Sequence, residues 1–250
     1  MSAVALISDL HSNQEALEAV FRRIDELGVT EVCCLGDVVG YGPDPDICTQ
    51  LVMTRCRWTI MGNHDWGVFH ELDDFNPLAR EALLYTRRRL KPNLFAPRRR
   101  AMWNFLRDLP EHMEDHGHVY YHGSPRDPIM EYVLKSDGFL EPDKMAEIFD
   151  RLDRPCFVGH THWPGIHRGD FRFTPATNET RVVEIGAEPV VVNVGSVGQP
   201  RDGDCRACFV VVDGTRVEFH RVEYEIAATQ QKILKARLHP ALAERLARGK

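Results

Sequence analysis

Five short polar clusters occur within the first 162 residues, and each directly follows an apolar, strand-like run. The clusters are Asp9-Leu10-His11, Gly36-Asp37, Gly62-Asn63-His64-Asp65, His122-Gly123 and Gly159-His160-Thr161-His162. They combine carboxylates, a carboxamide and imidazoles, and they contain no cysteine. Oxygen and nitrogen donors of this kind suit manganese, iron or zinc better than a structural cysteine site or a calcium cage. The clusters therefore predict a binding site for transition-metal ions.

The number of donors indicates more than one ion. Seven side chains of the clusters offer a suitable ligand atom: Asp9, His11, Asp37, Asn63, His122, His160 and His162. Seven ligands are too many for one ion that keeps an open coordination position. They suit two ions that share one bridging carboxylate.

The elements that precede the clusters explain how residues so far apart in sequence can meet. Residues 3–8, 32–35 and 58–61 are predicted strands. A capping-box pattern over residues 12–15 starts a helix that Gly28 ends, and residues 46–53 predict another helix. Strands that alternate with helices indicate parallel βαβ units. Because ligands bind at the carboxyl ends of the strands in such sheets, we expect all five clusters to meet at one edge.

The rest of the chain predicts a single α/β (α+β) domain over residues 1–250. Residues 76–109 are helical in pattern and belong to an insertion at about 66–118. A strand, a helix and a strand are expected at 119–121, 142–152 and 156–158. The β-rich stretches 181–185, 189–194, 207–213 and 216–222 suggest an antiparallel set of strands, and a C-terminal helix is expected at about 225–246. A two-layer β core flanked by helices is the simplest architecture.

The order of the clusters resembles that of a known family. D-x-H, G-D, G-N-H-D, an isolated H-G and G-H-T-H, in this order from Asp9 to His162, look like the calcineurin-like metallophosphoesterase superfamily. The resemblance implies a four-layer αββα sandwich. It also implies a hydrolase that cleaves a small phosphodiester, phosphomonoester or nucleotide phosphoanhydride with two metal ions.

The resemblance assigns a role to each donor. It implies a first metal ion held by Asp9, His11 and His162, a second held by Asn63, His122 and His160, and Asp37 as the bridge between them. The attacking group would be a hydroxide that bridges the two ions. His64 would face the substrate phosphate, where it stabilises the transition state or protonates the leaving oxygen. Asp65 is expected only to hold its loop in place.

One motif departs from part of the family. The protein serine/threonine phosphatases carry G-D-x-V-D-R-G, whereas this sequence has Gly40 and Tyr41 in place of the second aspartate and the arginine. This departure argues against a phosphoprotein substrate. The runs at residues 40–45 and 193–201 look like the small prokaryotic-type branch, which includes phosphodiesterases and dinucleoside polyphosphate hydrolases. A diadenosine tetraphosphate-type substrate is therefore an alternative.

Three residues near the motifs are candidates for substrate contacts. Arg126 and Arg201 could hold the side of a phosphate that faces away from the metal ions, because a guanidinium pairs bidentately with phosphate oxygens. An arginine beside a motif is about as often a surface residue. Tyr41 could stack on a base or pack its own loop, and packing is slightly favoured.

Composition limits the partners and the compartment. The 250-residue chain is 43% hydrophobic and 27% charged, which fits one globular domain. Its net charge of -6 argues against duplex nucleic acid as a partner, but leaves small phosphorylated substrates open. The absence of a basic leader and of a disulfide-like arrangement of the 7 cysteines predicts a cytoplasmic protein without a membrane span. Assembly into a homo-oligomer is left open.

Two rival functions are weighed against hydrolysis. The first is a binding or scaffold protein that kept the fold and lost catalysis, which is disfavoured because all the expected ligands are present. The second is a dinucleotide-binding oxidoreductase. It fails because the first strand is followed by Asp9-Leu10-His11 and not by a glycine-rich fingerprint.

Overall fold

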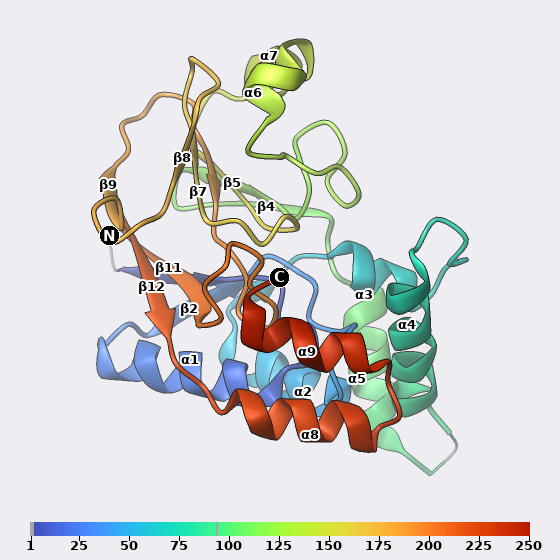
Figure 1. Cartoon of the computed structure of the whole chain (residues 1–250). Helices are drawn as coiled ribbons and strands as arrows, with labels where there is room; N and C mark the ends of the chain where they lie inside the picture. Colours follow the sequence, from blue (N-terminus) through green and yellow to red (C-terminus); the bar gives the residue numbers. More distant parts are fainter. Residues whose placement is uncertain (1–2, 94) are drawn as a thin grey trace.

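Two β-sheets packed face to face form the centre of the molecule in the computed structural model, which describes residues 3–93 and 95–250. Each sheet has six strands, in the orders β3-β2-β1-β11-β12-β9 and β4-β5-β6-β10-β7-β8. Helices cover the outer face of each sheet, so that the layers follow one another as helix, sheet, sheet and helix (Figure 1). The predicted α/β class and the αββα sandwich are confirmed.

The first half of the chain winds as predicted. β1 (Val4–Ile7), α1 (Gln14–Glu26), β2 (Glu31–Cys34), α2 (Pro45–Arg55) and β3 (Trp58–Thr59) follow one another, and the three strands pair in parallel. The expected capping box is wrong by one residue. Asn13, and not Ser12, caps α1, because its Oδ1 accepts a hydrogen bond from the amide of Ala16 at 3.2 Å.

The segment at 66–118 is helical for about half of its length, and it ends in a strand. After α3 (Asn63–Gly67) come α4 (Pro77–Leu90) and α5 (Pro97–Arg107), and then β4 (His112–Asp115), which forms a hairpin with β5 (His118–Tyr121). β4 lies at the edge of its sheet and has no buried residue, so it lacks the apolar signal of a strand. The turn shows in the positive φ angles of His116 and Gly117, which suit a tight hairpin.

The second sheet contains one strand, at residues 191–193, that the sequence predicts in the antiparallel set. It is covered by α6 (Asp137–Leu140) and α7 (Pro142–Asp150). Beyond β5 its strands are β6 (Cys156–Val158), β10 (Val191–Asn193), β7 (Gly165–His167) and, at the edge, β8 (Phe173–Pro175). The stretch at 189–194 was expected in an antiparallel set, but β10 pairs in parallel with β6 and antiparallel with β7. A short, fully buried run has no alternation that would reveal its neighbours.

The remaining strands form the antiparallel set that was predicted. β9 (Val182–Glu184), β11 (Ala207–Asp213) and β12 (Arg216–Val222) pair with one another, and β11 also pairs antiparallel with β1. The first sheet, which begins with strands from the start of the chain, is therefore completed by strands from its C-terminal part. This arrangement brings residues after 190 against the loop that follows β1, where the amide of Val197 donates to the carbonyl of Ser8 at 3.0 Å.

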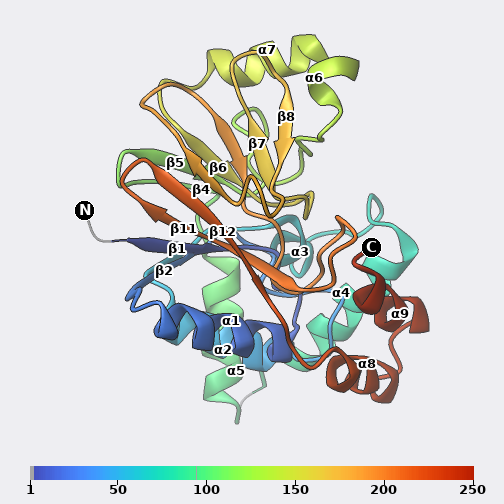
Figure 2. The same ribbon diagram turned by 60° about the vertical axis from the view of Figure 1, so that its left-hand side comes forward.

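The expected C-terminal helix at 225–246 is two helices. α8 (Ile226–Lys235) and α9 (Pro240–Arg248) form an antiparallel pair, which Figure 2 shows beside the ends of α1 and α4. The chain breaks at Arg237, which has a φ of 58°, and Pro240 starts the new helix because a proline cannot donate the hydrogen bond of a helix interior. The turn carries α9 back toward the edge of the first sheet.

The core has one part between the two sheets and another between the sheets and the helices. Successive side chains of a strand point into these two parts in turn. On β1, Leu6 points between the two sheets, where it packs with Tyr120 and Phe157, whereas Ala5 and Ile7 face the helices. All three of these β1 side chains are fully buried. Within residues 3–93 and 95–250, every helix is too short or too polar to cross a lipid bilayer.

Candidate metal centre

The predicted ligands lie in loops that leave the carboxyl ends of strands. The loop after β1 supplies Asp9 and His11, the loop after β2 supplies Asp37, the end of β5 supplies His122, and the loop after β6 supplies His160 and His162. All six are buried, and together they form the groups Asp9–His11–His162 and Asp37–His122–His160. Five of them, all except His122, have a positive φ, which is uncommon for residues with a side chain. Such backbone strain is concentrated at functional sites.

In the first group, two histidines direct unprotonated ring nitrogens toward each other. The Nε2 atoms of His11 and His162 lie 3.1 Å apart. His11 directs Nδ1 at the carbonyl of Val39 at 3.2 Å, and His162 directs Nδ1 at the carbonyl of Gln199 at 2.5 Å. Because a carbonyl only accepts hydrogen bonds, each Nδ1 carries the proton and each Nε2 carries a lone pair. Two lone pairs at this distance repel each other unless a cation lies beside them.

The second group repeats the arrangement. The Nε2 atom of His122 lies 3.2 Å from Nδ1 of His160. The other nitrogen of each ring faces a backbone carbonyl, that of Leu35 at 2.8 Å for His122 and that of Met130 at 3.0 Å for His160. Metal-bound histidines commonly donate their second nitrogen in this way, which fixes the ring. Burial lowers the pKa of His160 to about 3, so its ring is neutral.

Asp37 stands between the two groups. Its Oδ2 atom lies 3.5 Å from Nε2 of His11 and 3.5 Å from Nε2 of His122. Its Oδ1 atom accepts a hydrogen bond from the amide of His64 at 2.8 Å. Burial alone would raise the pKa of Asp37, but the neighbouring histidines, His122 first, hold it well below its usual range. Asp37 in turn raises the pKa of His122 to about 9 against the effect of burial, so without a metal ion a proton occupies this position.

Unpartnered polar atoms test whether metal ions fit here. Among residues 3–93 and 95–250, Oδ1 of Asp9, Oδ1 of Asn63 and Nδ1 of His64 are buried without a hydrogen-bond partner. The other oxygen of Asp9 accepts from the amide of His160 at 3.0 Å. A buried polar atom without a partner is costly, and a carboxylate oxygen especially so. Cations beside Oδ1 of Asp9 and Oδ1 of Asn63 would satisfy these two oxygens, so the donor set fits two metal ions.

Asp65 ties two of the site loops together. Its carboxylate accepts hydrogen bonds from the amides of Val38 at 3.3 Å, Val39 at 3.2 Å and Gly62 at 3.1 Å. The first two belong to the loop after β2 and the third to the loop after β3. Burial, followed by the charge of Asp37, raises the pKa of Asp65 to about 7. The side chain therefore holds the loops, as the sequence predicts.

His64 and Tyr41 pack against the first group. The His64 ring lies 4.8 Å from the His11 ring and 4.4 Å from the Tyr41 ring, measured between centroids. Burial lowers the pKa of His64 to about 4, which makes it neutral near pH 7. Tyr41 is only 7% exposed, and its ring also lies 4.8 Å from that of His11. Tyr41 therefore packs against histidines that come from two other loops.

The two candidate arginines lie in different surroundings. The Arg201 guanidinium lies 5.8 Å from the Tyr41 ring centroid, and its Nη2 donates to Oε1 of Gln199 at 2.9 Å. Arg126 instead forms ion pairs with Glu131 at 3.2 Å and Glu147 at 2.8 Å. The structure places Arg201 beside the site and engages Arg126 elsewhere.

Two residues that lie beside the site could not be identified as site residues from the sequence. Tyr132 stacks on His160 with ring centroids 3.7 Å apart, and it comes from a segment without regular structure after β5. Arg245 of α9 lies 5.6 Å from the Tyr41 ring centroid and donates to Gln199 Oε1 at 3.2 Å. Neither stands in a motif. Arg245 also depends on the unpredicted break between α8 and α9.

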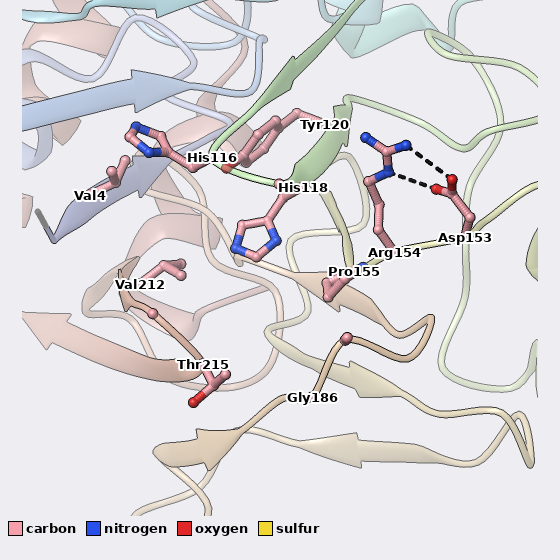
Figure 3. A pocket seen from close by; sticks show the side chains of 13 residues that line it. Val4, His116, His118, Tyr120, Asp153, Arg154, Pro155, Gly186, Val212 and Thr215 are labelled. Atoms are coloured by element: carbon pink, nitrogen blue, oxygen red, sulfur yellow. Dashed lines mark hydrogen bonds and ion pairs between the residues drawn. The ribbon is translucent and has the colours of Figure 1, made fainter. Parts of the chain in front are cut away.

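A pocket of about 400 Å³ lies far from these residues along the strands. Figure 3 shows His116, His118 and Tyr120 at this pocket, together with Val4. Val4 starts β1, whereas Asp9 follows its end, so the pocket is at the opposite edge of the sheets from the metal donors. The proposed chemistry therefore does not involve this pocket.

The fold and the donors at its edge define a metallophosphoesterase-type protein, an αββα sandwich with clustered aspartates and histidines at the strand ends. Residues 2–216 match the family model described as the calcineurin-like phosphoesterase superfamily domain. The chain belongs to that superfamily. This membership supports phosphoester hydrolysis as its general chemistry.

Known relatives resemble the chain over its whole length. An uncharacterized protein of Methanocaldococcus jannaschii, MJ0912, is 36% identical over 259 residues, which cover 100% of this chain and 99% of that protein. The structure of a metallophosphoesterase from Sphaerobacter thermophilus is 38% identical, with a TM-score of 0.84 over 99% of this chain and 100% of that one. The hypothetical protein PH1004 from Pyrococcus horikoshii shares the fold, with 20% identity and a TM-score of 0.78 over 100% of this chain and 99% of that one.

Proposed function

We propose that the chain hydrolyses small phosphorylated compounds, esters or anhydrides, with two transition-metal ions, manganese, iron or zinc. The observation that carries this proposal is the pair of close histidine contacts on either side of Asp37, in which ring nitrogens of His11 and His162 lie 3.1 Å apart and those of His122 and His160 lie 3.2 Å apart. Asp9, His11 and His162 would hold one ion. Asn63, His122 and His160 would hold the other, with Asp37 touching both.

The side chains around the ions have separate tasks. Two bound ions lower the pKa of a water molecule and offset negative charge on the phosphoryl oxygens. Asp37 is kept ionised by its histidine neighbours and oriented by the amide of His64. His64 is neutral because of burial, and it donates a hydrogen bond to a phosphoryl or leaving oxygen. Arg201 holds the side of the phosphate that faces away from the ions.

Hydrolysis and metal content test the proposal together. We expect the purified protein to cleave p-nitrophenyl phosphate or its bis ester when manganese is added, and to contain close to two ions per chain. Asp37→Ala should lower the metal content sharply and abolish cleavage, because it removes the ligand that both ions share. Inactivity with manganese, iron and zinc in a protein that binds two ions would favour the scaffold alternative.

A further inference from the structure

A second pocket, of about 230 Å³, adjoins the metal centre. Thr161, between two of the proposed ligands, belongs to its lining, and so do Tyr132 and Arg201. The Tyr132 ring lies almost parallel to the ring of His160, with an angle of 20° between them. The pocket therefore lies next to the metal centre, with the stacked pair of Tyr132 and His160 between them.

The pocket is lined with apolar and aromatic side chains that remain open to solvent. Tyr132 is 43% exposed although one face of its ring packs on His160, and Leu134 is 44% exposed. Trp163 is partly exposed beside them. Aromatic and aliphatic groups gathered around a hollow are typical of small-molecule sites. At this volume the hollow takes one ring system of a ligand and not a whole drug-sized molecule.

The wall that carries Tyr132 is held in place by an ion pair between Lys144 and the buried Asp137. Lys144 donates to Asp137 at 2.6 Å and to the carbonyl of Tyr132 at 2.5 Å. Asp137 is 2% exposed, and it also accepts from the amide of Leu134 at 2.8 Å. The segment 132–134 is therefore tied to α6 and α7 before any ligand arrives. A pocket arranged in advance loses less entropy when a ligand binds.

The charges beside the pocket are positive. Within residues 3–93 and 95–250, neither Arg201 nor Lys135 has a carboxylate within 4.0 Å. The Lys135 ammonium lies 3.4 Å from the Trp163 ring centroid. Arg201 has a buried Nε that lacks a hydrogen-bond partner in the part of the chain that the structure describes, and its guanidinium lies near Tyr41, which contacts the metal centre. Unneutralised cations next to a hollow lined by aromatic groups fit an anion that carries a planar ring.

We propose that this pocket, formed by Tyr132, Leu134, Lys135, Trp163 and Arg201, binds a planar aromatic group of the substrate, such as the base of a nucleotide. The ring stacks on the open face of Tyr132 and packs beside Trp163, while Arg201 contacts the phosphate between the ring and the metal centre. The inference rests on the proposed function, since it names the substrate class of the same site. It selects phosphoesters or anhydrides with an aromatic arm over those of aliphatic alcohols and simple sugars.

The test compares two ligands, one with and one without an aromatic base on the same ribose phosphate. Adenosine 5′-monophosphate and ribose 5-phosphate are titrated into the manganese-loaded protein, and binding is read from tryptophan fluorescence and from heat of binding immediately after mixing. We expect the nucleotide to bind at least about fivefold more tightly, because stacking of a base on an aromatic side chain contributes that much or more. Equal affinities, or no binding of either ligand, would overturn the proposal.

Variants assign the difference to the pocket. In Tyr132→Leu and Trp163→Leu the preference for the nucleotide should shrink toward one, while ribose 5-phosphate binds as before, because leucine keeps apolar bulk but removes the ring. Phe139→Leu is the matched control, since Phe139 is 87% exposed on α6 outside the pocket and should keep the preference. A preference that survives in both pocket variants contradicts the proposal.

The outcomes also separate this inference from the proposed function. A protein that hydrolyses phosphoesters but binds both ligands equally keeps its function and loses the aromatic pocket. A protein that prefers the nucleotide, loses this preference in the two variants and hydrolyses nothing retains the pocket and loses the proposed hydrolysis. Melting temperature and metal content are measured for each variant, because Tyr132 also packs on His160 and a loss of metal ions must be distinguished from a loss of the aromatic pocket.

Discussion

Gly40 lies directly against the imidazole of His64. Its φ is +96°, and a Cβ atom built on it would overlap Nδ1 of His64. This is the position at which the protein serine/threonine phosphatases have an aspartate that supports the histidine. Here the backbone itself fills that place, and Nδ1 of His64 has no hydrogen-bond partner among the described residues. The His64 ring is thus positioned by packing against Tyr41 and Gly40 and not by a carboxylate.

Gly40→Ala should displace His64 and leave the metal ligands in place. We expect hydrolysis to fall by at least about tenfold, because a misplaced proton donor loses much of its contribution, while metal content stays near two ions. Gly203→Ala is the matched control, since Gly203 has a similar φ of +91° but nothing within 4 Å of its Cβ position. Both variants carry the same backbone strain, so equal activity in the two would show that the contact with His64 is unimportant.

Variants of the two histidine pairs should separate the two ions. His162→Ala removes a donor of the first group and His160→Ala a donor of the second, so each should lower the metal content toward one ion per chain. Asp37→Asn should affect both ions, because Asp37 lies 3.5 Å from a histidine of each group. Metal analysis of the purified variants measures this. His220→Ala, on β12, should retain both ions, and a loss there would mean that histidine removal unsettles the protein in general.

The sequence predicts the site better than it predicts the sheets. Asp9, Asp37 and His160 could be placed together because each directly follows a buried strand, and the ends of parallel strands share an edge. The antiparallel hairpin of β11 and β12 was equally clear, since both strands are long and end at a glycine turn. Short-range patterns of this kind depend on neighbouring residues only.

The remaining features depend on contacts between distant segments. β10 is three buried residues that pair with either sheet equally well on local grounds, and its partner β6 is chosen by the packing of the whole domain. β4 is an exposed edge strand that is recognised only through its pairing with the next strand, β5. Tyr132 reaches the site from the irregular segment after β5, and Arg245 reaches it only because α9 folds back after α8. A side chain outside any motif carries no local mark of such a contact.

Arg126 and Arg201 should differ in their effect on hydrolysis. Arg201→Ala is expected to lower kcat/KM by at least about tenfold, because a charged hydrogen bond to phosphate is lost. Arg126→Ala should change kcat/KM less than about twofold, a difference typical of a residue outside the site, since its guanidinium is engaged by Glu131 and Glu147. Steady-state kinetics on one phosphodiester compares the two. A larger loss of kcat/KM in Arg126→Ala than in Arg201→Ala would contradict the assignment of Arg201 as the residue that contacts the phosphate.

Asp65 should matter for stability as well as for activity. Asp65→Ala leaves the amides of Val38, Val39 and Gly62 without their acceptor, and we expect the free energy of unfolding to fall by at least about 2 kcal/mol. Asp65→Asn keeps one oxygen and should lie between the alanine variant and the unchanged protein. Urea denaturation of the three proteins measures the order. Asp74→Ala, at an exposed position, should remain within about 0.5 kcal/mol of the unchanged protein.

Removal of the metal ions should destabilise the protein because it leaves like groups facing each other. Without a cation, the lone pairs of His11 and His162 stand 3.1 Å apart and Oδ1 of Asp9 is buried without a partner among the described residues. Ions present at about a hundredfold over their dissociation constant stabilise the folded state by about 2.7 kcal/mol, so chelation should lower the melting temperature by roughly 5–10 °C. Differential scanning fluorimetry before chelation, after it and after addition of manganese measures the change. Asp37→Asn should start from the lower temperature and respond little to manganese, and an unchanged protein that melts at the same temperature with and without metal would mean that the two groups are stable without ions.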